Sequence, residues 1–352
     1  MTGTRLKTLV VVASSLATLL ALEGVIRVAD LARGRSVRAR TAWYWLYEQD
    51  PLLGYRGRPG VRIRTPEDTI IHNADGFRDA RTLAEIMRIK DRKLVVCVGE
   101  SSTYGLSAGR MEDTYPARLE ARLRDLSGDQ RWTVYNAGMP GYTSYETAGV
   151  LALRLLKARP SIVLAMNLRN DYEFAALYLD DRVDYDRLPL RVAQLSSTWP
   201  NELLMRSSLY GLVATRLRPW FADDLGGATP DTPHDLPTRR GMSFYRDNLE
   251  RMAVLSASRG ARLMCVDQPV NDGPRTFGDA RREGLAMLRR ELHTFCRERS
   301  VALLEANGKI PWAEITPSDD VHLGPKGYDL LATLLAPQIL AAMAPPPPSS
   351  AP

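Results

Sequence analysis

The strongest structural signal in the sequence is the segment Lys93-Leu-Val-Val-Cys-Val-Gly-Glu-Ser-Ser-Thr-Tyr-Gly105. It opens with an apolar run of strand length, and the Gly-Glu-Ser-Ser that follows predicts a turn into a helix. Similar runs recur, and the full set is Lys93–Val98, Trp132–Asn136, Ser161–Met166, Ala261–Val266 and Val301–Glu305. Helical patterns lie between them, at Tyr115–Leu126, Glu146–Lys157, Phe244–Ser258 and Asp279–Arg299. Short strands that alternate with helices predict an α/β fold, a three-layer α/β/α sandwich around a parallel sheet.

The composition is that of a globular protein, with 45% hydrophobic and 25% charged residues in a chain of 352. The formal net charge of +6 is concentrated at the N-terminus, because residues 1–40 hold seven basic and two acidic side chains. The rest of the chain is nearly neutral and lacks the concentrated cationic face that nucleic-acid binding requires. We therefore expect no nucleic-acid partner.

The cysteines and histidines do not indicate a scaffold or a metal centre. The three cysteines, at positions 97, 265 and 296, are too few for a disulfide framework. Cys97 and Cys265 lie within apolar runs and are expected to be small core residues. No cluster of histidine, cysteine and carboxylate residues has the spacing of a metal site, so we expect neither a metal nor another cofactor.

The N-terminal segment is strongly apolar. Leu9–Leu22 contains no charged residue, and extended to Val28 the segment reaches the roughly 20 residues that a helix needs to cross a bilayer. Glu23 and Arg27 are spaced to pair across one helical turn near its end. We interpret residues 1–30 as an uncleaved signal anchor, because no small-x-small pattern for a signal peptidase follows the apolar run. A cleaved signal peptide and a buried core helix are the alternatives.

The charges that flank this segment point to opposite orientations. More arginines follow the apolar run than precede it, which by the positive-inside rule would keep the main body in the cytoplasm. Arg5 and Lys7, however, form the usual basic region of an export signal, and large domains cross the membrane largely regardless of charge. We therefore expect a single-pass membrane protein whose main domain lies on the extracytoplasmic side, in the periplasm or at the cell surface.

The remaining chain divides into regions of different composition. Residues 31–90 are rich in arginine, aromatic residues and turn signals and are expected to be a connecting region. Residues 91–340 hold the alternating strands and helices. Residues 176–243 interrupt that alternation, and we interpret them either as a lid over the site or as a passive surface insertion. The proline-rich residues 341–352 are not expected to fold.

Polar residues follow three of the predicted strands and occupy one late loop. Ser101 comes just after the first strand, where the carboxyl end of a parallel sheet can present a side chain to a ligand. The glycine-rich turn Asn136–Ser144 follows the second strand and can aim backbone N–H groups at an anion. Asn170 follows the third strand, and Asp319 stands three residues before His322. Each residue alone has an ordinary explanation as a turn residue, a loop residue or a helix cap.

Together these residues supply what acyl transfer requires. A serine hydroxyl becomes a good nucleophile only when a base takes its proton, and a histidine base needs an acceptor that holds the right tautomer. Among the four histidines only His322 has an acidic residue at this spacing; the others are His72, His234 and His293. The tetrahedral intermediate also needs converging donors for its oxygen. Ser102 is the nearest alternative nucleophile, and Asp320 is the nearest alternative acid.

The sequence resembles the SGNH (GDSL-like) hydrolases in four blocks that occur in family order, Gly99-Glu100-Ser101, Asn136…Gly141, Asn170-Asp171 and Asp319-x-x-His322. The resemblance extends over residues 91–340 and implies a five-stranded, mainly parallel, flavodoxin-like sheet. It implies a catalytic nucleophile, base and orienting acid at Ser101, His322 and Asp319. It also implies an oxyanion hole made by the backbone N–H groups of Ser101 and Gly141 and the side-chain amide of Asn170.

Two positions depart from the family pattern, and one stretch extends the likeness. Glu100 replaces the usual aspartate before the nucleophile. Leu168 replaces a glycine two residues before the third-block asparagine, which bears on the width of the oxyanion pocket. Upstream, Asp50–Arg56 and Asn73–Asp79 resemble a preamble seen in membrane-anchored bacterial members.

These features favour a serine esterase that removes acyl groups, above all small ones such as acetyl, from a cell-envelope carbohydrate or lipid. An O-acyltransferase would use the same acyl-enzyme but pass the group to a sugar hydroxyl, and exclusion of water from the site decides between the two. A catalytically silent envelope binding module on the same fold is the third hypothesis. The oligomeric state is not indicated by the sequence.

Overall fold

The structure is a computed structural model that describes residues 3–34, 45–65, 68–177, 203–204, 206–213, 236–273, 278–315 and 319–344. Its centre is a five-stranded parallel sheet in the order β6-β5-β7-β8-β9. The strands are β5 (Lys93–Gly99), β6 (Trp132–Asn136), β7 (Ile162–Met166), β8 (Arg262–Asp267) and β9 (Ala302–Glu305). The first of these strands lies second in the sheet, which is the flavodoxin-like order. The predicted fold class is confirmed, and every predicted strand is found to within one residue at each end.

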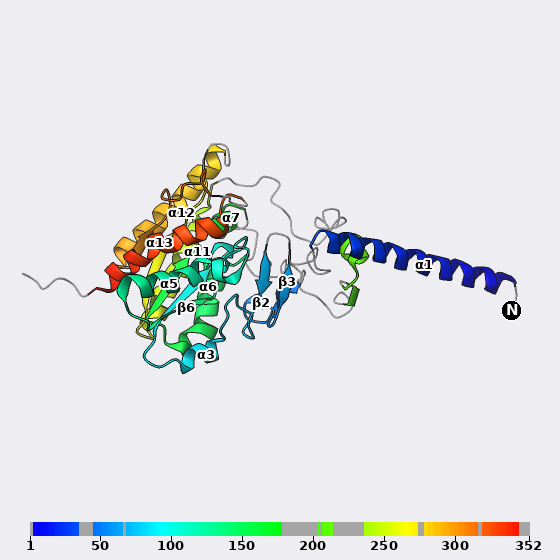
Figure 1. The fold of residues 1–352 in the computed structure, drawn as a ribbon. Helices are drawn as coiled ribbons and strands as arrows, with labels where there is room; N and C mark the ends of the chain where they lie inside the picture. Colours follow the sequence, from blue (N-terminus) through cyan, green and yellow to red (C-terminus); the bar gives the residue numbers. More distant parts are fainter. Residues whose placement is uncertain are drawn as a thin grey trace, which may run out of the picture.

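Side chains of β5 alternate between the two faces of the sheet, as the period of a strand requires. Leu94, Val96 and Val98 join one core cluster, whereas Val95 and Cys97 join the other. The helices over the Val95 face are α5 (Tyr115–Ser127) and α13 (Gly324–Met343). The helices over the Val96 face are α6 (Ser144–Val150), α11 (Arg239–Ala257) and α12 (Asp279–Glu298). Figure 1 shows the resulting three layers.

Shorter helices fill the connections. They are α3 (Leu83–Arg88), α4 (Ser101–Tyr104), the 3-10 turn η1 (Met111–Asp113) and α7 (Arg169–Leu177). The helix expected over Glu146–Lys157 is interrupted, because α6 passes into a π-helical turn at Leu151–Leu155 and then into a 3-10 turn at Leu156–Ala158. Leu151 and Leu155 are both buried there. The apolar spacing predicted a helix correctly but did not distinguish its hydrogen-bond pattern.

Residues 45–90 pack into the same core as the sheet. They form two antiparallel hairpins, β1 (Tyr47–Asp50) with β2 (Gly54–Gly57), and β3 (Arg62–Arg64) with β4 (Thr69–Ile71). Their buried side chains belong to the core cluster of the Val96 face and include Trp45, Tyr55, Ile63 and Phe77. Residues 31–90 were expected to be a connecting region, but residues 45–90 instead pack onto the central body and share its core.

A close backbone approach fixes one contact within this region. A Cβ added to Gly57 would lie 2.0 Å from the carbonyl oxygen of Gly76, and a Cβ added to Gly76 would lie 2.0 Å from that of Gly57. Gly76 also has a φ of +85°, a conformation that favours glycine. Gly57 therefore requires glycine for reasons of space, and Gly76 requires it for reasons of both space and backbone conformation.

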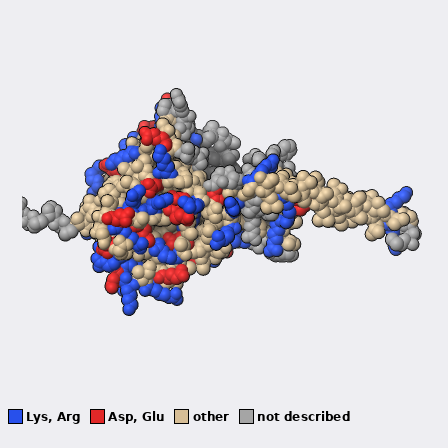
Figure 2. All heavy atoms as spheres, viewed as in Figure 1, with Lys and Arg blue, Asp and Glu red and all other residues tan. Residues whose placement is uncertain are grey.

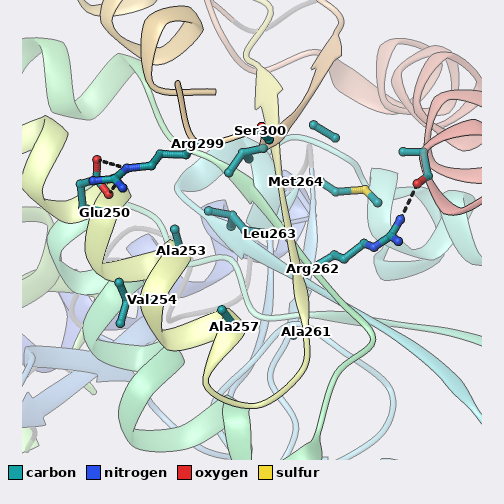
Figure 3. A pocket seen from close by; sticks show the side chains of 13 residues that line it. Glu250, Ala253, Val254, Ala257, Ala261, Arg262, Leu263, Met264, Arg299 and Ser300 are labelled. Atoms are coloured by element: carbon teal, nitrogen blue, oxygen red, sulfur yellow. Dashed lines mark hydrogen bonds and ion pairs between the residues drawn. The ribbon is translucent and has the colours of Figure 1, made fainter. Parts of the chain in front are cut away.

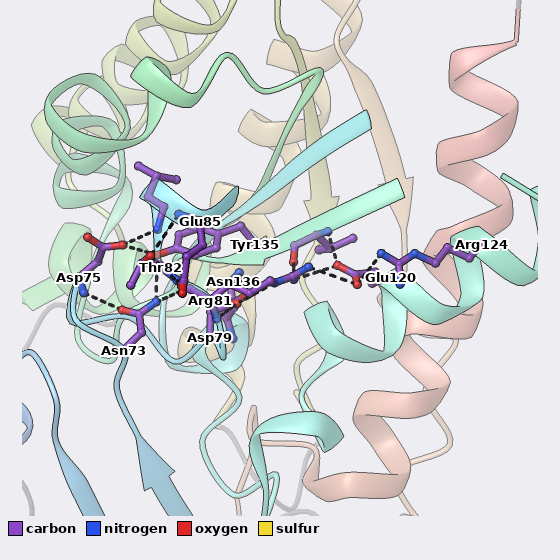
Figure 4. Close-up of polar contacts among 12 residues, drawn as sticks. Asn73, Asp75, Asp79, Arg81, Thr82, Glu85, Glu120, Arg124, Tyr135 and Asn136 are labelled. Atoms are coloured by element: carbon purple, nitrogen blue, oxygen red, sulfur yellow. Dashed lines mark hydrogen bonds and ion pairs between the residues drawn. The ribbon is translucent and has the colours of Figure 1, made fainter. Parts of the chain in front are cut away.

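Polar contacts join the loop after β4 to the sheet and to α5 (Figure 4). The carboxylate of Asp79 accepts a hydrogen bond from the backbone N–H of Asn136 at 3.1 Å. Arg81 pairs with Glu120 on α5 at 2.9 Å and donates to the carbonyl oxygen of Val134 at 2.8 Å. The loop thus supports the end of β6, from which the predicted glycine-rich turn departs.

Helix α1 (Gly3–Ala32) projects away from the central body. It is long and apolar enough to cross a membrane. An 18-residue window of the helix has a mean hydropathy of 2.2, and none of that window is buried inside the protein. An N-terminal signal sequence meets the same criteria of length and hydropathy. Figure 2 shows an almost uncharged surface along most of the helix. The predicted pair between Glu23 and Arg27 is present at 2.6 Å.

Most of the predicted insertion, 176–243, lies outside the described residues, as do residues 345–352 of the predicted tail 341–352. The tail prediction was wrong at its start, because residues 341–343 form the end of helix α13. The part that is described includes residues 206–213, of which 208–213 are helical. The two ends of the insertion meet, because the backbone N–H of Thr238 donates to the carbonyl oxygen of Ala175 on α7 at 3.1 Å.

Candidate active site

Ser101 stands at the first position of α4, directly after β5. The turn between them is tight, since a Cβ on Gly99 would lie 2.3 Å from the carbonyl oxygen of Met166 on the neighbouring strand. The φ of +150° at Gly99 also lies outside the range that other residues favour. This geometry brings the Ser101 side chain to the carboxyl-end edge of the sheet.

The loop before α13 places His322 against Ser101. The His322 Nε2 atom lies 2.8 Å from Ser101 Oγ, and His322 Nδ1 lies 2.5 Å from Asp319 Oδ2. Because a carboxylate only accepts hydrogen bonds, Nδ1 carries the proton, which leaves Nε2 of a neutral ring to accept from the serine hydroxyl. The structure thus brings these three residues into one continuous hydrogen-bonded chain.

Asp319 is held in place by its own loop. Its Oδ1 atom accepts from the backbone N–H groups of Val321 at 2.9 Å and His322 at 2.8 Å. Partial burial raises the pKa of Asp319, but the bonds from the His322 ring and from these two N–H groups outweigh it and lower the pKa to about 2. The carboxylate is therefore ionised at neutral pH and can stabilise a cationic imidazole.

The neighbouring carboxylate, Asp320, makes a different contact. Its Oδ2 atom lies 2.8 Å from Arg169 Nε, and Arg169 also pairs with Glu173 at 2.6 Å. The backbone carbonyl oxygen of Asp320 accepts from Asn271 N–H at 2.8 Å. Asp320 therefore ties the histidine loop to the start of α7 and contacts no ring nitrogen of His322.

The loop that contains Gly141 and the first turn of α7, which contains Asn170, are hydrogen-bonded to each other, and Asn170 is also bonded to the serine turn. The Asn170 side-chain amide donates to the carbonyl oxygen of Tyr142 at 2.9 Å, and the Asn170 backbone N–H donates to Glu100 at 2.9 Å. Gly141 has a φ of +82°, and a Cβ there would lie 2.7 Å from the hydroxyl of Tyr55. The three expected oxyanion donors thus belong to one connected edge of the sheet.

Two buried acids support this edge. Burial raises the pKa of Glu100 to about 8. Burial likewise raises the pKa of Asp171 to about 7, although its carboxylate accepts from the backbone N–H of Ser144 at 2.9 Å. Leu168, the residue that departs from the family glycine, is fully buried and belongs to the hydrophobic core.

Ser102 is engaged elsewhere. Its hydroxyl lies 3.2 Å from the carbonyl oxygen of Val321 and 3.2 Å from the Nε2 atom of Gln268. Gln268 in turn accepts from the backbone N–H of Arg169 at 3.0 Å. Gln268 follows β8 at the same edge of the sheet, and this position is the only signal by which the sequence could have indicated it.

Residues that precede β5 in the sequence form hydrogen bonds with the turn that follows Ser101. The hydroxyl of Tyr104 donates to His72 Nε2 at 2.7 Å, because His72 Nδ1 already donates to the Arg58 carbonyl oxygen. Burial lowers the pKa of His72 to about 4, so its ring is neutral. Arg78 pairs with Asp68 in the interior and donates to the carbonyl oxygen of Gly105 at 2.9 Å.

No second nucleophile and no metal centre compete with this arrangement in the part of the chain that is described. His293 contacts Asp267 at 3.0 Å, and His234 lies outside the described residues. The three cysteines are free and buried. Within the described ranges, no three or more histidine, cysteine, aspartate or glutamate residues are grouped to hold a metal ion.

A hollow of about 600 Å³ lies at the opposite edge of the sheet, where β8 and β9 begin (Figure 3). Its walls carry the Glu250–Arg299 ion pair and apolar side chains such as Val254 and Leu263. None of the residues that line it is a histidine or a cysteine, so it offers neither an imidazole base nor a thiol nucleophile.

The chain is similar to several solved hydrolase structures and matches one family model. A lipase/acylhydrolase from Enterococcus faecalis aligns with a TM-score of 0.44 and 17% identity, over 72% of this chain and 99% of that one. An acetyl-xylooligosaccharide esterase mutant from Geobacillus aligns with a TM-score of 0.45 and 14% identity, over 70% and 94%. No curated protein matches the sequence significantly. The sequence model of the GDSL-like Lipase/Acylhydrolase family matches residues 97–330, well over half of the chain. The chain therefore belongs to the GDSL-like lipase/acylhydrolase family of ester hydrolases.

Proposed function

We propose that the protein is a serine esterase in which Ser101 is the nucleophile, His322 the general base and Asp319 the acid that orients it. The observation that carries this proposal is the pair of hydrogen bonds that the His322 ring makes. Its Nδ1 atom lies 2.5 Å from Asp319 Oδ2, and its Nε2 atom lies 2.8 Å from Ser101 Oγ. Both distances are close enough for hydrogen bonds, and bonds to an ionised carboxylate are shorter than bonds between neutral groups.

The chemistry follows from this geometry. Ser101 Oγ bonds to the acyl carbon while its proton moves to His322 Nε2, and Asp319 stabilises the imidazolium. The ester C–O bond then breaks, and the imidazolium returns the proton to the departing alkoxide. Water attacks the acyl-enzyme by the same route, which releases the acid and frees Ser101.

The oxyanion of each tetrahedral intermediate would be bound by the backbone N–H groups of Ser101 and Gly141 and by the amide of Asn170. Support comes from the hydrogen bonds that fix Asn170 between Tyr142 and Glu100. An amide has two N–H bonds, so Asn170 can keep the contact with Tyr142 and still offer a donor to the oxyanion.

We further propose that α1 is an uncleaved membrane anchor and that residues 91–340 with the packed residues 45–90 form one catalytic unit on the extracytoplasmic side. Shared burial of Trp45, Tyr55 and Phe77 with the sheet supports the single unit. The substrate we propose is an acyl ester, with acetyl the first choice, of a cell-envelope carbohydrate or lipid. An envelope location would place such esters within reach of an anchored enzyme.

Steady-state hydrolysis of 4-nitrophenyl acetate tests the proposal. Ser101→Ala and His322→Ala should each lower kcat by several orders of magnitude, because each removes a group that acts as part of one unit. Ser102→Ala is the matched control and should retain most activity. Transfer of the acetyl group to an added sugar in preference to water would identify an acyltransferase that uses the same site.

A further inference from the structure

Glu23 of α1 caps a helix in a distant segment. Its carboxylate accepts hydrogen bonds from the hydroxyl of Ser207 at 2.7 Å and from the backbone N–H groups of Ser208 at 2.9 Å and Leu209 at 2.8 Å. The Ser207 hydroxyl also accepts from the backbone N–H of Tyr210 at 3.0 Å. Ser207 is thus the N-cap of the helix at 208–213, and Glu23 places a negative charge at its positive end.

Arg27 adds to these contacts, and we call the contacts of Glu23 and Arg27 with residues 206–209 the joint. Arg27 donates to the Glu23 carboxylate at 2.6 Å and to the carbonyl oxygen of Arg206 at 3.0 Å. Each Glu23 oxygen therefore has two donors, so the carboxylate is satisfied by protein groups although it directly follows the apolar run Leu9–Leu22 of α1. The joint fixes part of the insertion against α1, and Figure 1 shows the short green helix beside the inner end of α1.

A groove of about 560 Å³ lies between the two segments. Leu16, Leu19 and Leu20 line it from α1, and Leu209 and Val213 line it from the short helix. The three leucines share one face of α1 with Glu23 and Arg27, since residues three and four apart lie on the same side of a helix. The groove is thus apolar along its length and polar at the joint.

We propose that this anchor groove, the space between Leu16–Leu20 and 209–213, holds the acyl chain of an anionic phospholipid of the bilayer. The inference rests on the proposed membrane anchor. The protein buries none of the apolar window of α1, so the medium that surrounds the helix also fills the groove. Arg27 and Arg206 are exposed cations that line its polar end, where they complement a lipid phosphate at the membrane surface.

The lipid site would set where the enzyme works. The insertion leaves and re-enters the body at Ala175 and Thr238, and Ala175 lies on α7, whose first turn contains Asn170. An insertion held by lipid at 206–213 therefore links the active-site edge of the sheet to the bilayer surface. We expect the site to meet esters that are presented at that surface.

Depth-dependent quenching in nanodiscs tests this site. The full-length chain with Val213→Cys carries a single NBD fluorophore, and labelling is selective because the three native cysteines are buried. The nanodiscs contain phosphatidylcholine and phosphatidylglycerol with a nitroxide on the acyl chain. The label at 213 should be quenched, whereas a label at Leu126→Cys, an exposed position on α5, should not. Equal quenching at the two positions would overturn the proposal.

Two variants test separately the joint and the cations that we expect to contact the lipid phosphate. Glu23→Ala removes three charge-assisted hydrogen bonds to residues 207–209, so it should weaken docking of the short helix by at least about tenfold and reduce quenching at 213. In the unsubstituted background, quenching at 213 should increase with phosphatidylglycerol content. Arg206→Gln should keep the quenching but weaken this increase, because one of the two cations at the polar end is lost. Quenching that responds to neither change would contradict the proposed site. Release of the protein by carbonate extraction would overturn the anchor itself, and the groove with it.

Discussion

Replacement of Asp319 by asparagine tests how the base is oriented. The asparagine carbonyl oxygen would take the place of Oδ1, which accepts from the N–H groups of Val321 and His322. The asparagine NH₂ group would then face His322 Nδ1, which lies 2.5 Å from the present Oδ2. Two donors cannot bond, so the ring would adopt the tautomer with its proton on Nε2, which cannot accept the proton of Ser101.

The magnitude follows from the exposure of the acid. A fully buried acid of this kind is worth about 10⁴ in kcat. The Asp319 side chain is 43% exposed, so water screens part of its effect on the imidazolium. We therefore expect Asp319→Asn to lower kcat on 4-nitrophenyl acetate by about 10²- to 10³-fold.

Asp320→Asn is the matched control, because it removes a carboxylate from the adjacent position. Asp320 pairs with Arg169 rather than with the histidine, and Arg169 keeps its second partner, Glu173. The variant should lose stability in a thermal melt but lose less than about tenfold in kcat. If Asp320→Asn lowers kcat further than Asp319→Asn while both variants are folded, the assignment of the acid is wrong.

Further expectations concern stability and solubility. The pKa of buried Glu100 is raised by burial from 4.5 to about 8, so the native state keeps a proton that the unfolded state loses, and stability falls as pH rises through this range. In Glu100→Gln this loss should become smaller, and the part due to the raised pKa of Asp171 should remain. Urea titrations at several pH values would measure the difference, and parallel curves for the two proteins would contradict the shift. Gly57→Ala should cost about 2–3 kcal/mol in unfolding free energy through its clash with Gly76, whereas Gly60→Ala, with no heavy atom within 4 Å, should cost about 1 kcal/mol for its positive φ. Equal costs would argue against the close approach. A chain that begins at residue 42 should be soluble and active. A chain that begins at residue 91 should aggregate, because it lacks the buried side chains of residues 45–90. A soluble, folded chain from residue 91 would show that residues 45–90 are not needed for folding.

The fold was predictable because its signals are local. Buried parallel strands are continuous apolar runs, and each of the five such runs became a strand. The π-helical turn at Leu151–Leu155 was not predictable, since its leucines also fit an α-helical pattern. The packing of residues 45–90 into the core depends on contacts between distant parts of the chain, such as that between Gly57 and Gly76, which no local pattern indicates.

The same distinction applies to the site. Ser101, Asp319 and His322 could be proposed because each stands in a short motif, and the structure places them within hydrogen-bonding distance. Gln268 and Arg169 bond to the site loops across the sheet edge, and their roles depend on which loops become neighbours. The joint between Glu23 and residues 207–209 was likewise not predictable, because the spacing of Glu23 and Arg27 indicated only their mutual pair.

Reaction of the folded, full-length protein with a fluorophosphonate, followed by mass mapping of the labelled peptide, tests the central claim most directly. An activated serine displaces fluoride from phosphorus, whereas ordinary serines do not react. The structure predicts one phosphonylated residue, Ser101, with its label lost in Ser101→Ala and retained in Ser102→Ala. Label that persists in Ser101→Ala, or a wild-type protein that is folded but unreactive, would contradict the proposed nucleophile and base.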